Sequence, residues 1–366
     1  MTILIHTIPS DVHAAAVQIA LKSKDIPSQT WFMGDYPSHQ VSTFRYKFGG
    51  GSNFLIRDRF DTLCSSTKFS TVWHRRIPEF QSASPEVEEI DKVFVKNEIS
   101  RFLSTSYPLV GVDAFWVNDA TKSQHCENKL IQLDAALKVG LKIPETLASN
   151  SPDDIRDFLK FLLPRKIIYK PLRGFSWIYK DRQLITYTKI LNETDLPSDS
   201  LLQVCPGIYQ EYIEKDFEVR VTIMGRHCVA AALYAPDKED WRMSSEKNEL
   251  IAIAHSLPSE IEEMCIAMMK NLGIVFGCAD FVVTPNGDYI FLEINEAGQF
   301  MWVEQMIPEL LLIDSFSEFL VERNPDFRWK KNSSAITLKE IIQNKEFNNL
   351  MNMADRHVHA RNPTIL

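Results

Sequence analysis

One predicted β-hairpin late in the chain constrains the fold more than any other feature. The dipeptide Asn286-Gly287 lies between two apolar runs in the segment FGCADFVVTPNGDYIFLEIN. Such an arrangement is the strongest short-range signal for a hairpin with a two-residue turn. Counting outward from the turn places Asp280 directly opposite Glu293. Asn295 then projects from the same face as Glu293, because side chains alternate along a strand.

The two facing carboxylates create an electrostatic conflict that predicts a bound cation. At a separation of about 5 Å and an effective dielectric near 20 they would repel each other by roughly 3 kcal/mol, and like charges opposite each other destabilise a sheet. An all-oxygen set of Asp280, Glu293 and Asn295 suits Mg²⁺ in a site that handles phosphate. The alternative is a hairpin edge with both carboxylates solvated, since a slip of one residue would break the pairing.

Bulk properties argue against several classes of function. The 366 residues suffice for two or three domains. A net charge of −8 argues against nucleic-acid binding through a general basic surface. No apolar run approaches the roughly 18 residues of a membrane span, and the start MTILIHTIPSDVH does not resemble a signal peptide. The six cysteines show no CxxC or zinc spacing, which indicates reduced core thiols of a cytoplasmic protein.

The pattern along the chain predicts four parts. A β-α-β opening indicates an N-terminal α/β lobe over residues 1–118. Helical periodicity followed by short strands indicates a central lobe over 119–202, and a larger set of strands indicates a C-terminal lobe over 203–325. The remaining residues, 326–366, are polar and of mixed charge, with one helical stretch (338–355) and a loose tail.

Two lysines are candidates for anion binding. Lys170 lies on a predicted strand, IIYKPL, among apolar neighbours, and burying an ammonium group requires a compensating anion. That anion is either a triphosphate or an internal carboxylate. Lys129 lies in the predicted helix ENKLIQLDAAL, where it is either a phosphate ligand or an exposed helix lysine.

An acidic residue and an arginine share one face of a predicted strand in the segment QEYIEKDFEVR. Glu218 and Arg220 are two residues apart, so their side chains project to the same side. They form either a structural ion pair or a ligand site. In the second case the carboxylate would bind a ribose hydroxyl, and the planar guanidinium would bind a phosphate.

This ordered set of residues resembles the ATP-grasp superfamily of carboxylate–amine ligases. Within that superfamily the chain looks like the microviridin-type (graspetide) peptide macrocyclases, which are related to the ribosomal-protein glutamate ligases. The resemblance covers roughly residues 1–322. The closer match rests on five segments: Val72–Arg76, Asn128-Lys129, Gly140-Leu141 with Pro144 and Thr146, Asp240–Arg242, and Glu293–Trp302.

The resemblance implies a role for each part of a nucleotide site. Lys129 and Lys170 would hold the α- and β-phosphates. The backbone at Glu211 and Ile213 would bind adenine, with Tyr212 beside it. Glu218 would bind the ribose, and Arg220 would bind the γ-phosphoryl group. Asp280, Glu293 and Asn295 would bind Mg²⁺. Arg242 would bind the substrate carboxylate or acyl phosphate.

The peptide side of the site is less defined by the resemblance. Arg75 and Arg76 either bind an anionic substrate or are solvated in a surface loop. The flap Arg173–Trp177 is bulkier than the Gly/Ser-rich flap of many ATP-grasp ligases, and none of its residues receives a role. For the leader segment of a precursor peptide, the strand pair around Ile178–Thr188 is the candidate site.

Together these features predict an α/β protein of α+β lobes with the three-lobe ATP-grasp fold, which binds ATP and Mg²⁺ between its central and C-terminal lobes. The implied activity is phosphorylation of side-chain carboxylates of a ribosomally made peptide and closure of ester or amide rings by its Thr, Ser or Lys side chains. One alternative is a ligase that adds free amino acids, and another is a non-catalytic nucleotide-binding regulator. The resemblance also implies a homodimer.

Overall fold

A computed structural model describes residues 1–58, 62–65, 69–76, 86–174, 176–179, 182–185, 189–236, 249–331 and 334–358. The chain divides into two compact units. Among the described residues, unit 1 comprises Met1–Thr121, Met224–His227 and those from Gln299 to 358, and unit 2 comprises Lys122–Ile223 and Cys228–Gly298. No helix among the described residues is long and apolar enough to cross a bilayer.

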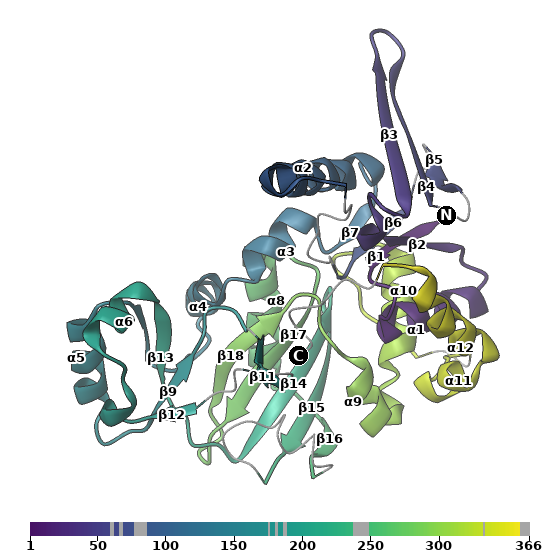
Figure 1. Cartoon of the computed structure of the whole chain (residues 1–366). Coiled ribbons are helices and arrows are strands. Elements are labelled where there is room, and N and C mark those ends of the chain that lie inside the picture. Colours follow the sequence, from purple (N-terminus) through teal and green to yellow (C-terminus); the bar gives the residue numbers. More distant parts are fainter. Residues whose placement is uncertain are drawn as a thin grey trace. The chain divides into compact units, whose positions relative to one another are not determined.

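Unit 1 is built around a parallel sheet with the strand order β2-β1-β6-β7 (Figure 1). Strands β1 (Ile3–Thr7) and β2 (Ser28–Phe32) are joined by helix α1 (Val12–Ser23), which confirms the predicted β-α-β opening. The helix begins at Asp11, whose side chain accepts the first free backbone N–H groups. The other two strands of the sheet are β6 (Thr71–His74) and β7 (Phe115–Val117).

Among its described residues, unit 1 also contains a small antiparallel sheet and further α-helices. Strands β3 and β4 of that sheet form a long ribbon (Figure 1). The bounds are β3 (Gln40–Lys47), β4 (Gly51–Asp58), β5 (Thr62–Ser65), α2 (Lys92–Val110), α9 (Met301–Met306), α10 (Leu312–Glu322), α11 (Leu338–Gln343) and α12 (Lys345–Asn352).

The C-terminal residues are more ordered than the sequence predicted. The single expected helix is two helices, α11 and α12, because Asn344 ends the first and caps the second. Both helices pack against α1. Beyond them the His357 ring contacts the buried Asp35 carboxylate, with an Nδ1···Oδ2 distance of 2.6 Å. The expectation of a loose tail is therefore wrong as far as residue 358, the last described.

Unit 2 contains two larger sheets and a separate strand pair, β10-β11. The four-stranded antiparallel sheet has the order β12-β9-β13-β8, and the five-stranded sheet has the order β16-β15-β14-β17-β18. The strands are β8 (Thr146–Ser149), β9 (Ile167–Lys170), β10 (Ser176–Tyr179), β11 (Arg182–Ile185), β12 (Lys189–Leu191), β13 (Gly207–Glu211), β14 (Phe217–Met224), β15 (His227–Tyr234), β16 (Ile251–His255), β17 (Phe276–Val283) and β18 (Tyr289–Asn295).

Helices cover these sheets, and apolar side chains from both layers form the core. The helices are α3 (Ala120–Cys126), α4 (Lys129–Lys138), α5 (Pro152–Leu162), α6 (Asp199–Val204) and α8 (Ser259–Leu272). Helices α4 and α8 contact each other, and they also contact strands β18 and β17 respectively. Their buried Leu133 and Met268 pack in one cluster with Val221, Phe281 and Phe291 of the five-stranded sheet. This burial fixes the strands that carry the predicted metal ligands.

The turn of the β17-β18 hairpin is longer than the sequence predicted. Val283 faces Tyr289, so five residues, 284–288, connect the strands. Gly287 has a φ of +83°, which favours glycine, and its N–H donates to the Thr284 carbonyl over 2.8 Å. The Asn-Gly signal therefore located the turn but gave its length incorrectly.

A β-bulge restores the predicted pairing further along the hairpin. Phe281 faces Phe291, but the adjacent Asp280 faces Glu293, so Leu292 is an extra residue on β18. Without it, Asp280 would face Leu292. A bulge is a common device for redirecting a side chain beside a functional site. Here it brings the two carboxylates opposite each other.

Candidate nucleotide and metal site

Each of the two facing carboxylates has a cationic partner. On the neighbouring strand β14, Nη1 of Arg220 donates to both Asp280 oxygens, at 2.8 and 2.7 Å. At the first residue of α4, Nζ of Lys129 donates to Oε2 of Glu293 at 2.8 Å. The repulsion expected from the sequence is thus offset by two positive side chains. Four of the predicted site residues come together in this way within unit 2.

The pair formed by Arg220 and Asp280 is the more enclosed of the two. Both of its side chains are mostly buried, whereas Glu293 is 40% exposed and Lys129 is 25% exposed. Burial alone would lower the pKa of the Arg220 guanidinium, but attraction to Asp280 and, to a smaller degree, to Glu293 raises it above its ordinary value. Arg220 therefore carries a permanent positive charge at this place.

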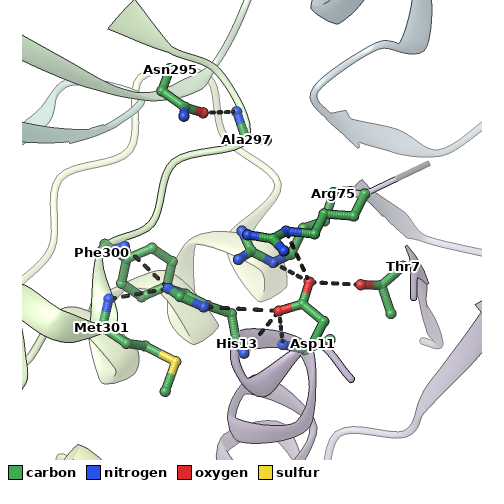
Figure 2. Close-up of polar contacts among 10 residues, drawn as sticks. Thr7, Asp11, His13, Arg75, Asn295, Ala297, Phe300 and Met301 are labelled. Carbon is green, nitrogen blue, oxygen red and sulfur yellow. Dashed lines mark hydrogen bonds and ion pairs between the residues drawn. The ribbon is translucent and has the colours of Figure 1, made fainter. Parts of the chain in front are cut away.

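Asn295 supplies an amide oxygen at the end of the same strand. Its Oδ1 accepts the N–H of Ala297 at 3.0 Å (Figure 2). Two carboxylates and one amide give the all-oxygen donors that Mg²⁺ prefers. No cluster of three or more His, Cys, Asp or Glu residues suited to a metal occurs among the described residues. The donor set fits Mg²⁺ completed by oxygens of a bound phosphate, and it does not fit a closed protein cage.

Lys170 lies at the end of β9 in the other sheet of unit 2. Its Nζ donates to Oε1 of Gln210 at 2.9 Å, and the Gln210 amide nitrogen donates to the Thr146 hydroxyl at 2.9 Å. The sequence offered an internal carboxylate or a triphosphate as the partner of this lysine. The contact with Gln210 is to a neutral amide, which orients the ammonium group.

The segment after β13 presents backbone groups suited to a flat polar ring. The N–H of Glu211 donates to the Glu145 carbonyl and the N–H of Tyr212 donates to the Lys166 carbonyl, at 2.9 and 2.8 Å. The Glu211 carbonyl is an acceptor and the N–H of Ile213, two positions along the chain, is a donor, which is the pattern that an adenine edge complements.

Glu218 lies beside a shallow pocket at the start of β14. Nζ of Lys215 is 2.5 Å from one Glu218 oxygen, and both side chains are almost entirely buried. The pocket is lined by Lys215, Asp216, Phe217, Glu218, Leu233 and Ala235. A ligand hydroxyl would find a carboxylate here that is already oriented by its lysine.

Two predicted anion-binding arginines occupy different environments in unit 1. Arg75 is buried, and its Nε donates to Oδ2 of Asp11 at 2.6 Å (Figure 2). Arg76 is partly exposed, with its Nε 3.9 Å from the same oxygen. Because Asp11 also caps α1 and accepts the Thr7 hydroxyl at 2.7 Å, it ties both arginines to the core of the unit. Arg75 is thus engaged within the protein, which differs from the solvated loop residue expected as the alternative to substrate binding.

The histidine beside this cluster, His13, was not predicted from the sequence. Nε2 of His13 accepts the N–H groups of Phe300 and Met301, at 3.2 and 3.3 Å (Figure 2). That nitrogen must therefore be unprotonated, and burial lowers the pKa of His13 well below its ordinary value. A histidine on a buried helix face carries no local signal of such a contact, because its partners lie far along the chain.

Some predicted residues lie outside the described ranges. These are Arg242, its neighbours Asp240 and Trp241, and parts of the candidate leader site around Ile178–Thr188.

The described cysteines form no disulfide. Three of them are buried core thiols, as expected, but Cys205 is exposed.

Comparison with known proteins gives the fold of this chain. No protein-family model matches it. Among solved structures, the RiPP-associated ATP-grasp ligase of Chryseobacterium gregarium, in complex with ADP and a leader and core peptide, has a TM-score of 0.80 at 24% identity, covering 90% of this chain and 99% of that chain. The macrocyclase MdnC of Microcystis aeruginosa, bound to the precursor peptide MdnA, has a TM-score of 0.76 at 26% identity, covering 88% and 100%.

Curated relatives match about half of the chain. The probable α-L-glutamate ligase of Chromohalobacter salexigens is 24% identical over 200 residues, and the match covers 53% of this chain and 63% of that protein. The chain thus spans less than two thirds of this relative's length. The chain has the ATP-grasp fold, so the predicted fold class is confirmed. Its resemblance to the RiPP-associated ATP-grasp ligases and macrocyclases is confirmed as well.

Proposed function

We propose that this protein is an ATP-dependent ligase that activates side-chain carboxylates of a peptide as acyl phosphates and closes them into ester or amide rings. The observation that carries the proposal is the facing pair Asp280 and Glu293, each hydrogen-bonded to a cationic side chain. Asn295 lies on the same strand as Glu293. Two solved ATP-grasp relatives are bound to precursor or to leader and core peptides, which supports a peptide substrate.

In this proposal the nucleotide is bound by residues of unit 2. The Glu211 carbonyl and Ile213 N–H bind the adenine, with Tyr212 beside the ring, and Glu218 binds the ribose. Lys170 holds the phosphates together with Lys129. Mg²⁺, when bound by Asp280, Glu293 and Asn295, would neutralise charge on the phosphate oxygens. An ADP- and Mg-bound ATP-grasp relative supports this choice of ligands.

The reaction needs positioning and charge neutralisation more than a covalent enzyme nucleophile. A peptide carboxylate oxygen attacks the γ-phosphorus and ADP leaves. A hydroxyl or amine of the same peptide then attacks the acyl carbon, gives up its proton and displaces phosphate. Each ring therefore consumes one ATP, and the peptide loses the mass of one water, whose oxygen leaves in the phosphate. Arg220 stabilises the charge on the transferred phosphoryl group. Arg242 remains the candidate for the acyl phosphate.

Partners and setting follow from the same proposal. The substrate is a peptide that carries acidic residues near Thr, Ser or Lys, and Arg76 is the more available of the two N-terminal arginines to attract it. We place the protein in the cytoplasm as a homodimer. Domain limits at residues 118, 202 and 325 remain a prediction, as does a leader site near Ile178–Thr188.

A second activity receives support from the curated relatives, which are named as glutamate ligases. Such an enzyme would join a free amino acid to an acceptor. A regulator without turnover is less compatible with the set, since both lysines, the oxygen donors and Arg220 are all present. ADP release separates these cases: we expect it with ATP, Mg²⁺ and an acidic peptide, and not with free glutamate. Release that occurs only when free glutamate is added to the peptide would favour the amino-acid ligase, and no release under either condition would favour the regulator.

A further inference from the structure

The outer edge of β18 is held by a side chain that none of the proposed roles includes. Gln132 lies on α4, three residues after Lys129, and is almost fully buried. Its amide nitrogen donates to the Ile294 carbonyl at 2.9 Å and to the Cys126 carbonyl at 2.7 Å. Its amide oxygen accepts the Ile294 N–H at 3.0 Å. Gln132 therefore satisfies both backbone groups of Ile294.

The position of Ile294 gives these contacts their significance. It lies between Glu293 and Asn295, on the last strand of the five-stranded sheet. An edge strand leaves every second residue without a ladder partner on its outer side. The Gln132 amide supplies the donor and acceptor that a further strand would supply.

The bulge leaves the end of β18 with few pairs to β17, so a contact on the outer side of β18 is needed to hold its register. Because Leu292 is an extra residue, the strand after it is held to β17 only by the last few pairs before it ends at Asn295. A slip by one residue would turn Glu293 away from Asp280. The Gln132 contact to Ile294 opposes that slip, and the same helix places Lys129 against Glu293.

We propose that Gln132 is a positioning residue that sets the register of the bulged strand and so places Glu293 and Asn295 for the metal and nucleotide. The proposal rests on the proposed function of these residues. It assigns Gln132 no contact with the ligand itself. Helix α4 would then carry two residues of the site: Lys129 at its start, proposed to bind phosphate, and Gln132 one turn later, which holds the outer edge of β18.

The test compares three proteins in the binding of a non-hydrolysable ATP analogue by calorimetry, over a series of Mg²⁺ concentrations. Gln132→Leu removes the three hydrogen bonds at similar size. Leu133→Ala is the control, because the adjacent buried leucine weakens the same core without touching β18 hydrogen bonds. We expect Gln132→Leu to raise the half-saturating Mg²⁺ concentration by about ten- to a hundredfold, the usual effect of losing a residue that supports a metal ligand. Leu133→Ala should leave it near the wild-type value.

Three results would decide the matter otherwise. An unchanged Mg²⁺ requirement in a folded Gln132→Leu variant would overturn the inference and leave the proposed function intact. An equal shift in both variants would reduce Gln132 to a core residue and overturn it too. Wild-type protein that binds no nucleotide would overturn the proposed function first, and this inference with it.

A second measurement uses the wild-type protein and does not depend on the variant folding. Hydrogen exchange of the Ile294 amide should be slow, although β18 is an edge strand, because the N–H is bonded to the buried Gln132 oxygen. If the Ile294 amide exchanged at the rate of an exposed amide, Gln132 would not be holding this edge of β18, and the proposal would be contradicted.

Discussion

At the level of single residues, the two carboxylates of the proposed metal site differ in how much their removal would destabilise the fold. Asp280 neutralises a buried guanidinium, whereas Glu293 pairs with a lysine that is partly exposed. The sequence alone suggested that removing either carboxylate would relieve repulsion. The structure changes that expectation, since Arg220 would lose its partner while remaining buried.

We therefore predict that Asp280→Ala and Glu293→Ala both abolish ATP-dependent product formation but differ in stability. Loss of Asp280 should lower the free energy of unfolding by about 3–5 kcal/mol, as expected when one partner of a buried pair is removed. Loss of Glu293 should cost less than about 1 kcal/mol, because that pair is partly solvated. Urea titration measures both, with Asp288→Ala of the exposed Lys142 pair as the control. Equal losses would refute the distinction.

The two lysines that we propose as phosphate ligands, Lys129 and Lys170, also differ in their hydrogen-bond partners. Lys129 must leave Glu293 to reach a phosphate, whereas Lys170 is bonded to the neutral Gln210. Lys170→Ala should therefore weaken binding of a non-hydrolysable ATP analogue more than Lys129→Ala does. Calorimetric titration in the presence of Mg²⁺ checks this. Wild-type affinity in both variants would mean that neither lysine contacts the nucleotide.

Buried histidines in unit 1 predict a loss of stability in acid. Nδ1 of His74 is 3.1 Å from Nδ1 of His6, and burial lowers the pKa of His74 to about 4. The folded protein therefore keeps His74 neutral between pH 6.5 and about 4. In the unfolded protein the same ring gains a proton below its ordinary pKa of about 6.5. Stability should fall by about 3 kcal/mol from this group as the pH drops from 6.5 to 4.

Chemical denaturation at several pH values tests this sign. His74→Asn should show a shallower decline than the wild type between pH 6.5 and 4, although His6 and His13, whose pKa values burial also lowers, will retain part of it. The exposed His125, changed to Asn, is the matched control and should reproduce the wild-type decline. A His74 variant with the full wild-type slope would show that its neutral form does not stabilise the fold.

At the level of elements, the sequence predicted what is local and missed what is distant. The Asn286-Gly287 signal located the hairpin and the facing carboxylates. It could not reveal the extra Leu292, because a bulge is fixed by packing of the whole sheet. Gln132 gave no signal at all, since a helical glutamine is ordinarily solvated and its partner Ile294 lies far along the chain.

The end of the chain illustrates the same limit. Residues 326–366 read as a polar extension, yet a buried carboxylate from another helix anchors it. Glu304 on α9 accepts the N–H of Ile313 on α10 and the N–H of Leu338 on α11, at 2.7 and 2.8 Å. It thereby satisfies backbone donors at the starts of two helices.

We expect Glu304→Gln to destabilise unit 1 by about 1.5–3 kcal/mol, because a charged acceptor is replaced by a neutral amide that also brings donors toward N–H groups. The midpoint of thermal or urea unfolding measures the effect. Glu309→Gln, at an exposed position nearby, should change it little. If both variants unfold alike, Glu304 does not anchor α11.

At the level of the whole molecule, the ATP-grasp fold and the grouping of the candidate site residues support the proposed peptide ligase. The chain as a whole is acidic, with a net charge of −8, so in this proposal an acidic peptide would have to be attracted by a local group of positive charges. The resemblance to macrocyclases extends over nearly the entire chain, whereas that to glutamate ligases covers about half of it.

The most direct test of the central claim is the mass of the peptide after reaction. Purified protein, ATP, Mg²⁺ and free glutamate are incubated with short peptides that carry Glu or Asp near Thr, Ser or Lys, and the products are analysed by mass spectrometry. The Glu293→Ala variant serves as the inactive control. Ring closure predicts a product lighter than the peptide by one water for each ring, formed only by the wild type. A product heavier by an amino-acid residue would contradict the claim and identify a ligase of the glutamate type.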